Sequence, residues 1–457
     1  MSRKKILLLS DDMRMHSGVA RMSREFVLGT SDKYDWVQVA GAINHPENGN
    51  RIVIKSDDNF KLSEDASIVL YPVTGYGNPD LVRYLIKTEK PDAILHFTDP
   101  RFWVWLYNME HEIRQDIPIM YYNIWDDLPD PLYNRDFYRS SDLLMSISKQ
   151  TYGINKRILS KYDYKDWQLQ YVPHGISEKW FFKIDKDDVG FKRFENDLGF
   201  DKYKFKILYC NRNIRRKNPG DVALAYKHFM DGLTEEQRKE CCLVFHSAPS
   251  DENGTDMKAV CSTLLPDYPV IWTYDKGMNF QDVQMNYLYN SCDVYVNMAS
   301  NEGFGLGSAE SIMTETPIIV NVTGGLQDQC GFKKEDGTYL TAEDYTGQWG
   351  SNNDGKYQEH GEWVKPVFPS NISLQGSPQT PYIFDDRCRW DDVGDALRYW
   401  YDKGPEGRAE AGKKGSEFLK SKEIKMTAKM MSDGFDKAMS TTLEKWKPQP
   451  RYTMEVV

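Results

Sequence analysis

The sequence lacks the features that mark several specialised protein classes. Its first cysteine is Cys210, its seven cysteines form no CxxC pair, and 58 Lys and Arg are outnumbered by 68 Asp and Glu. Cysteines that are odd in number and all lie after residue 200 suggest no disulfide framework and favour a reducing compartment. The net charge of −10 argues against a generally basic nucleic-acid binder, although it leaves room for a local basic cleft.

Long apolar runs are also missing. After the basic start Met1–Lys5, only Ile6–Leu9 are continuously apolar, which is shorter than the core of a signal peptide. No later run approaches the length of a membrane span. We therefore expect a cytoplasmic protein that is not integral to a membrane.

What the sequence does contain is an alternation of short apolar runs and longer amphipathic stretches. This alternation predicts βα units that feed parallel sheets. The 457 residues and the 13% aromatic content predict two or three domains with cores of their own. The expected strands are Ile6–Leu9, Val37–Ala40, Ile68–Tyr71, Ala93–His96, Ile117–Tyr122, Leu143–Ile147 and Leu169–Val172, followed by a second series at Phe205–Tyr209, Leu243–Phe245, Val270–Thr273, Val294–Val296 and Pro317–Val320.

The two series of strands define the expected domain organisation. Residues 1–180 form an N-terminal Rossmann-like domain, and residues 203–423 form a C-terminal one. Residues 331–386, rich in Gly, Asn, Asp and Pro, are expected to be an insertion or long loop. Residues 424–457 contain a helix with a Met-rich face, which we expect to pack back on the N-terminal domain. Two such domains that face each other leave a deep cleft between them.

The segment Ser300–Glu310, SNEGFGLGSAE, carries the strongest chemical pattern. It lies between a buried strand and a helix, so its glycines predict a turn where backbone N–H groups approach a ligand closely. The positive end of the following helix suits a phosphate or a developing negative charge. Glu302 and Glu310 add two carboxylates, which are good acceptors for sugar hydroxyls. Taken alone, the segment is equally compatible with an ordinary Gly-rich turn.

Positive charge is concentrated after the first strand of the second series. The run Asn211–Pro219 contains Arg212, Arg215, Arg216 and Lys217 and precedes a helical stretch. Arginine forks and a lysine point charge at the mouth of a cleft meet the needs of a diphosphate leaving group. Without its neighbours, such a run would be interpreted as a solvated face.

A weaker pattern is the turn after the first strand, Ser10–Arg21, which contains the single glycine Gly18. Alone it is equally a structural β–α connection. The acidic pairs Asp11–Asp12 and Asp126–Asp127 are expected to be turn and surface residues. No DxD or His-rich segment stands out as a metal site, so we expect no metal ion.

Taken together, these patterns resemble the retaining nucleotide-sugar glycosyltransferases of family four, which have the GT-B architecture. The resemblance covers most of the chain outside residues 331–386. Its most specific part is the spacing of Glu302 and Glu310 within NEGFGLGSAE. Further matches are Ser17–Arg21 with the family's first-domain glycine loop, Tyr171–Ile176 with its PNG turn, Arg212 and Lys217 with its Arg and Lys pair, Leu288–Val294 with its approach to the next strand, and Thr323–Leu326 with its GG turn.

The resemblance implies a role for each matching position. Arg212 and Lys217 would hold the donor diphosphate and, with Glu302 on the transferred sugar, form the catalytic set. Glu310 would accept hydrogen bonds from the ribose, and the base would lie near Thr273–Gly277. The implied donor-binding residues are Gly18, Arg212, Lys217, Phe304, Gly305, Leu306 and Glu310.

On the acceptor side the sequence departs from the family pattern. Many members carry an H-x-H pair after the strand that corresponds to residues 92–95, where this chain has His96 and Thr98. Thr98 can hydrogen-bond a sugar hydroxyl but cannot act as an acid or base near neutral pH. Trp125 falls where the family often has His. The candidate acceptor or sugar contacts are therefore His16, Arg21, His96, Thr98 and Trp125.

We expect a retaining, metal-independent glycosyltransferase that moves a sugar from a UDP- or GDP-linked donor to a hydroxyl of a glycan or small molecule, with no other cofactor. Aromatic and basic residues of the first domain, Arg101–Trp105 with Arg21 and Arg24, keep DNA open as an acceptor. A phage-like glycosyltransferase acting on hydroxymethylated pyrimidine bases is therefore the main alternative. A nucleotide-sugar epimerase and a non-catalytic sugar-nucleotide-binding protein are further alternatives.

Overall fold

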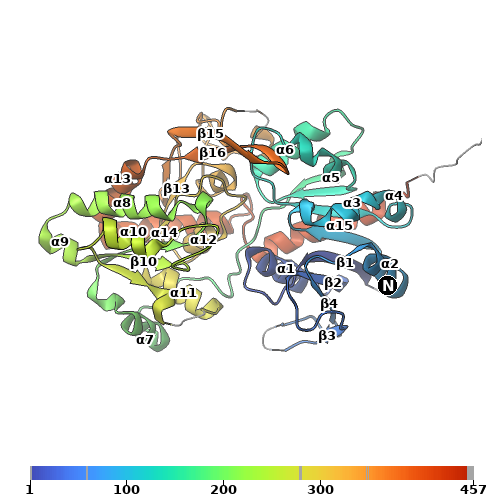
Figure 1. Cartoon of the computed structure of the whole chain (residues 1–457), viewed down its shortest axis with the longest axis horizontal. Coiled ribbons are helices and arrows are strands. Elements are labelled where there is room, and N and C mark those ends of the chain that lie inside the picture. The colour runs from blue at the N-terminus through green and yellow to red at the C-terminus, as the bar shows by residue number, and fades with distance from the viewer. Residues whose placement is uncertain (1–2, 58–59, 277–279, 346, 348, 450–457) are drawn as a thin grey trace, which may run out of the picture.

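Two α/β domains lie side by side, each built on its own sheet (Figure 1). The computed structural model describes residues 3–449 apart from 58–59, 277–279, 346 and 348. In spatial order, the first sheet consists of β3 (Ile52–Ile54), β4 (Ile68–Thr74), β2 (Tyr34–Ile43), β1 (Lys4–Asp11), β5 (Ala93–Phe97), β6 (Ile119–Asn123), β7 (Leu143–Ser146) and β8 (Leu169–Tyr171). The second consists of β11 (Val270–Trp272), β10 (Cys241–His246), β9 (Phe205–Cys210), β12 (Val294–Asn297), β13 (Ile318–Asn321) and β14 (Val364–Val367). The predicted pair of Rossmann-like domains is confirmed.

The central strands are continuous apolar runs because helices cover both faces of the sheets. β1 pairs in parallel with β2 and β5, and Ile6, Leu7, Leu8 and Leu9 are all fully buried. A parallel strand that is buried on both faces needs apolar side chains at successive positions.

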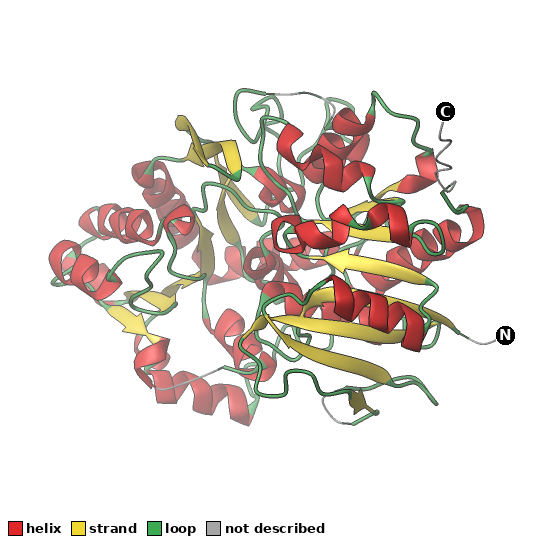
Figure 2. Ribbon diagram, turned by 45° about the vertical axis from the view of Figure 1, so that its right-hand side comes forward, coloured by secondary structure: helices red, strands yellow, loops and turns green. Residues whose placement is uncertain are grey.

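None of the described helices combines the length and the apolar character needed to cross a membrane. The helices (Figure 2) are α1 (Gly18–Gly29), α2 (Pro79–Glu89), α3 (Val104–Asn108), α4 (Glu110–Ile113), α5 (Arg135–Arg139), α6 (Lys149–Leu159), α7 (Val189–Leu198), α8 (Pro219–Asp231), α9 (Glu235–Lys239), α10 (Met257–Leu264), α11 (Asp282–Ser291), α12 (Leu306–Met313), α13 (Trp390–Asp402), α14 (Gly404–Lys420) and α15 (Ala428–Lys445).

Residues 331–386, expected to be an insertion or long loop, contain a strand of the second sheet. β14 runs parallel to β13 at the edge of that sheet. Pro366 interrupts its apolar run in the sequence, but an edge strand tolerates a residue that has no backbone N–H to donate. The antiparallel hairpin of β15 (Asn371–Ser377) and β16 (Thr380–Arg387) follows. The part that lies outside the sheet is therefore smaller than the sequence pattern indicated.

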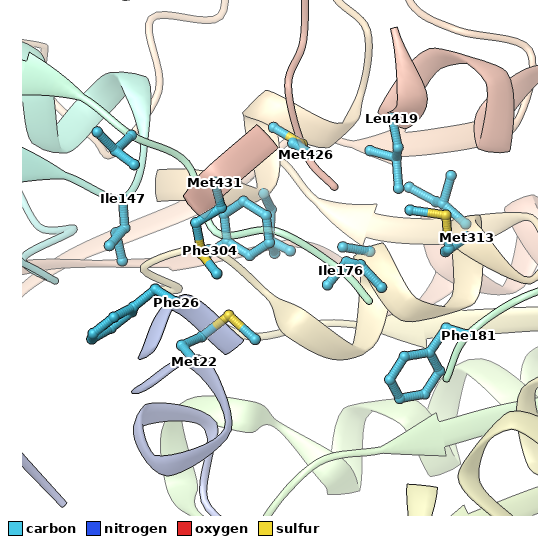
Figure 3. Close-up of a cluster of buried hydrophobic side chains, with 14 of the residues drawn as sticks. Met22, Phe26, Ile147, Ile176, Phe181, Phe304, Met313, Leu419, Met426 and Met431 are labelled. Carbon is cyan, nitrogen blue, oxygen red and sulfur yellow. The ribbon is translucent and has the colours of Figure 1, made fainter. Parts of the chain in front are cut away.

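The chain returns from the second domain to the first through α15. The backbone of Ile176 donates to Met426 and accepts from Ala428, at 2.9 Å each, where the two segments run together. Phe435 of α15 then stacks on Phe26 of α1 with ring centroids 4.3 Å apart. One buried apolar cluster consequently spans both domains (Figure 3), and it includes Met22, Phe26, Ile147, Ile176, Phe304, Met313, Leu419, Met426 and Met431.

Candidate functional site

A cleft of about 670 Å³ lies between the two domains, on the side where strands of both sheets end. Its lining includes residues that follow β5, β6 and β7 of the first sheet and β9 and β12 of the second. Ligands of open α/β sheets bind at this edge, because the loops and helix N-termini there converge. The cleft is therefore the candidate site, and each domain supplies one of its walls.

The Gly-rich turn after β12 forms part of the C-terminal wall. Gly305, at the N-terminal end of α12, has φ +85°, a left-handed conformation that favours glycine. Among the described residues, no side chain caps α12, and none accepts from the N–H groups of Leu306 and Gly307 at its start, so these groups can meet a ligand. The next loop supports this turn, because Gly325 N–H donates to the Glu302 carbonyl oxygen at 2.8 Å, and a Cβ atom on Gly325 would clash with Gly303. The result is a preformed platform for an anion.

Two cations and one carboxylate lie beside this platform. Lys217 is buried, and its Nζ donates to Glu302 Oε2. Arg216 donates from Nη1 to the Asn301 carbonyl oxygen at 2.7 Å, and the same nitrogen is 3.9 Å from Glu302 Oε2. Burial, and then the charge of Arg216, hold the pKa of the Lys217 ammonium well below its usual range. A bound anion would offset both effects, so this wall favours negative charge.

The structure does not bring Arg212 into this group. Its Nε donates to Asp251 Oδ2 at 2.8 Å, its side chain is 63% exposed, and it is not among the described residues that line the cleft. The turn Arg215–Lys217 instead directs Arg216 and Lys217 to the cleft. Several cations follow one another in this loop, but the path of its backbone determines which of them line the cleft.

Glu310 and Arg21, predicted for the donor and acceptor sides, meet each other across the domain interface. Arg21 of α1 donates from Nη1 to Glu310 Oε1, and Tyr289 donates to Glu310 Oε2 at 2.8 Å. Glu310 is only 3% exposed, and burial raises the pKa of its carboxyl although Arg21 opposes the shift. The predicted base region, Thr273–Gly277, is described only as far as Lys276, where it forms a 3₁₀ turn, and Gly277 lies outside the described residues.

Gly18 lies at the cleft, opposite the start of α12. A Cβ atom on Gly18 would lie 3.0 Å from Leu306 Cδ1, so the glycine permits the close approach of the two domains. His16, two residues earlier, is exposed and is not among the described residues that line the cleft. Asp11 and Asp12 are both buried, and Asp11 accepts a hydrogen bond from the Ser17 hydroxyl at 3.1 Å, which holds the turn. This corrects the expectation that Asp11–Asp12 is a surface pair.

His96 and Thr98 are buried and are not among the described residues that line the cleft. His96 is fully buried and shares a hydrogen bond between Nδ1 and the Tyr107 hydroxyl at 2.7 Å. Burial lowers the pKa of His96 to about 3, so its imidazole is neutral at physiological pH. Because side chains alternate along a strand, Phe97 and Asp99 line the cleft while His96 and Thr98 do not. The departure from the H-x-H pattern thus lies inside the first domain.

Trp125 does line the cleft, together with Arg101 and Asp99. Arg101 Nε donates to Asp99 Oδ1 at 2.8 Å, and its guanidinium lies over the Trp125 ring, 5.6 Å from the centroid. Of the five predicted acceptor contacts, Trp125 alone is among the described lining residues. It is mostly buried, so it offers an edge to the cleft.

The acidic pair Asp126 and Asp127, expected at the surface, lines the cleft instead. Asn352 of the second domain donates to Asp127 Oδ1 at 3.2 Å and holds the loop inward. Burial raises the pKa of Asp126, and burial together with the charge of Asp126 raises that of Asp127 well above its usual range. The prediction of a surface position was wrong because a local turn pattern cannot reveal a contact with a residue more than two hundred positions away.

His174 is a cleft residue that sequence reasoning did not single out. It shares a hydrogen bond between Nδ1 and the Tyr122 hydroxyl at 2.8 Å, and its ring meets Phe304 edge-on at 5.2 Å. Burial lowers the pKa of His174 to about 3. Its place in the PNG-like turn was the available signal, because that turn closes the first domain beside the cleft.

No protein-family model matches the chain, and no curated protein is recognisably similar in sequence. Solved structures do resemble it. Sucrose-phosphate synthase from Thermosynechococcus elongatus has a TM-score of 0.63 and 13% identity, covering 97% of this chain and 100% of that one. Anabaena HepE in complex with UDP and glucose has a TM-score of 0.63 and 12% identity, covering 96% and 100%. An Escherichia coli trehalose-6-phosphate structure bound with UDP-2-fluoro glucose has 0.61 and 11%, covering 98% and 100%. At these identities the likeness bears on the fold alone, and it confirms the predicted GT-B architecture.

Proposed function

We propose that this protein is a retaining glycosyltransferase that moves a sugar from a UDP- or GDP-linked donor to a hydroxyl acceptor. The observation that carries the proposal is the uncapped start of α12 beside Arg216, Lys217 and Glu302 in the interdomain cleft. Positive groups next to a carboxylate suit a ligand that carries a diphosphate and sugar hydroxyls in sequence. UDP-glucose is the first donor to test, because HepE and the Escherichia coli protein were solved with UDP, glucose or a fluorinated UDP-glucose.

The proposed mechanism is mainly electrostatic. As the bond between the anomeric carbon and the phosphate oxygen breaks, charge accumulates on the diphosphate, where Lys217, Arg216 and the first N–H groups of α12 stabilise it. Glu302 then accepts hydrogen bonds from the transferred sugar in place of Lys217. The acceptor hydroxyl forms the new bond on the same face, and its proton leaves with the diphosphate. These protein groups supply the positive charge, so we propose that no metal ion or further cofactor is required.

The test is incubation of the whole chain with UDP- and GDP-sugars, with and without acceptors. Slow release of nucleoside diphosphate that an acceptor accelerates supports a transferase, and NMR of the product's anomeric carbon shows whether configuration is retained. Interconversion of the free donor would instead indicate an epimerase. Binding without turnover would indicate a sugar-nucleotide-binding protein.

The cysteines support a cytoplasmic location for this activity. All seven are free thiols; six are buried and Cys210 is half-buried. A protein with seven unpaired thiols is suited to a reducing compartment. We therefore propose that the enzyme works in the cytoplasm.

A further inference from the structure

The two walls of the cleft differ in charge. The described part of the N-terminal wall presents three carboxylates, Asp99, Asp126 and Asp127, and a single cation, Arg101. The C-terminal wall, in contrast, presents two cations beside one carboxylate and carries the proposed donor site. An acceptor must therefore bind against the carboxylate-rich wall.

The single cation on the N-terminal wall is already neutralised. Arg101 Nε lies 2.8 Å from Asp99 Oδ1 and 3.0 Å from Asp99 Oδ2, and its Nη2 also donates to Oδ2. Asp99 thus engages the guanidinium along one full edge. One face of the guanidinium covers Trp125. An incoming phosphate would have to displace Asp99 before it met an unpaired positive charge.

The other two carboxyls offer hydrogen bonds but no positive charge. Asp126 and Asp127 are adjacent and largely removed from water, and the one described side chain that donates to Asp127 is Asn352. Burial raises the pKa of both carboxyls and favours a shared proton, although the charge of Arg216 opposes the shift at both and that of Lys217 opposes it at Asp126. In either protonation state their oxygens suit hydroxyl groups, whereas a phosphate would meet like charge or bare acceptors.

The β15–β16 hairpin completes this end of the cleft without adding a cation. Thr380 and Ile383 of the hairpin are among the lining residues. Tyr382 packs edge-on against Tyr133 of the first domain at 4.9 Å, and Phe384 N–H donates to the Leu128 carbonyl oxygen at 2.7 Å. Figure 1 shows the hairpin reaching from the second domain toward α5 and α6 of the first. It therefore contributes one hydroxyl and one apolar contact to the acceptor end.

Resting on the proposed glycosyltransferase function, we propose that the acceptor is an uncharged polyhydroxyl compound, a sugar or glycan without phosphate groups, held by Asp126, Asp127 and Thr380. In the transfer, the acceptor oxygen bonds to the anomeric carbon as the carbon–phosphate-oxygen bond breaks, and the hydroxyl proton leaves with the nucleoside diphosphate. A sugar phosphate or a DNA strand brings negative charge to these carboxylates, and the cations nearest to them, Arg216 and Lys217, are already engaged by the donor diphosphate in the proposed complex. We expect discrimination against such acceptors on the order of a hundredfold in kcat/KM.

The experiment is a matched acceptor panel with UDP-glucose, read by nucleotide release and mass spectrometry. It contains aldoses, disaccharides and inositol, the 6-phosphates of the same aldoses, and duplex DNA with hydroxymethylated cytosine. Neutral members that accelerate turnover above the acceptor-free rate support the inference. Acceleration by the 6-phosphates or the DNA that equals or exceeds acceleration by the neutral members, or acceleration by none of them, overturns it. Binding of UDP and hydrolysis of the donor without acceptor test the proposed glycosyltransferase function. The acceptor panel tests the choice of acceptor, so the failure of one proposal can be told from the failure of the other.

A charge variant tests the same point within the protein. Asp99→Asn removes the partner of Arg101 and is expected to raise kcat/KM for the 6-phosphates at least tenfold relative to the neutral sugars. Asp80→Asn, which removes an exposed carboxylate of α2 in the same domain, is the matched control. An unchanged ratio in Asp99→Asn, with UDP binding intact, would contradict a neutralised Arg101 at the acceptor end.

Discussion

The two walls of the cleft hold their charges in different ways. On the C-terminal wall, Lys217 is buried against Glu302, and burial disfavours its charged form until an anion arrives. On the N-terminal wall, Arg101 is already paired with Asp99. The C-terminal wall therefore gains from receiving negative charge, whereas the N-terminal wall carries more carboxyl groups than cations and presents oxygen acceptors. Under the proposed function this difference places the donor on the C-terminal wall and the acceptor on the N-terminal wall, and variants of each wall should separate the two roles.

The largest expected effect comes from the donor wall. Lys217→Ala should lower kcat/KM for the donor about a hundred- to a thousandfold, because one pre-organised contact to the developing charge is lost. Steady-state kinetics with UDP-glucose measure it. Lys227→Ala, an exposed lysine of α8 paired with Asp231, is the control and should leave turnover unchanged. Normal turnover in Lys217→Ala would contradict the proposed role of the C-terminal wall in binding the donor diphosphate.

The pair that joins the domains should affect stability rather than one substrate. Arg21→Ala leaves Glu310 buried without its cation and should lower the free energy of unfolding by about 3 kcal/mol, since a buried carboxylate loses its partner. Urea denaturation followed by circular dichroism measures the loss. Arg21→Met combined with Glu310→Gln removes both charges and should recover much of it. Equal destabilisation in the single and double variants would refute the cross-domain pairing.

Donor affinity should depend on pH in a known direction. The pKa of Lys217 lies well below its usual value in the free protein, and a bound diphosphate raises it again, so binding takes up a proton. UDP affinity should therefore fall as pH rises through the free-state pKa, by up to about tenfold per pH unit. Calorimetric titration at several pH values measures it. Lys217→Arg keeps its charge throughout and should show a flat profile; a slope that persists in that variant would assign the proton elsewhere.

The smallest expected effect belongs to the acceptor end. Thr380→Ala removes the hairpin hydroxyl and should raise the acceptor KM about two- to tenfold, the value of one neutral hydrogen bond. UDP affinity should not change, because the proposed donor groups lie at the start of α12 and in the turn Arg215–Lys217 and not on the hairpin. Thr380→Ser, which keeps the hydroxyl, should restore the acceptor KM. A change in UDP affinity instead would place the hairpin at the donor end.

Sequence reasoning predicted the parts of this molecule whose chemistry is local. The strand cores are continuous apolar runs, and the Gly-rich turn with Lys217 nearby could be located because strand, turn and helix follow one another. Side-chain direction at the loops could not be predicted. Arg212 points to solvent, and His96 points into the first domain, because each depends on the path of the backbone. Asp127 is held inward by a hydrogen bond from Asn352 of the other domain.

Strands β14 and β15 were not predicted from the sequence, because their formation also depends on contacts with neighbouring elements. β14 is short, lies at a sheet edge and contains Pro366, so its pattern is that of a loop until β13 is beside it. The hairpin's outer strand, β15, is almost entirely exposed, and its apolar alternation is limited to Ile372 and Leu374, which is too short to distinguish it from a loop. Both elements come from residues 331–386, where the resemblance to a known family also ends. The acceptor end was thus the least predictable part of the site.

The most direct test of the central claim is calorimetric binding of UDP and of uridine to the wild-type chain and to Lys217→Ala. If the C-terminal wall holds the diphosphate, wild type should bind UDP far more tightly than uridine, and Lys217→Ala should lose most of that difference while uridine binding stays the same. An equal preference for UDP in both proteins would contradict the account, because the diphosphate would then bind elsewhere.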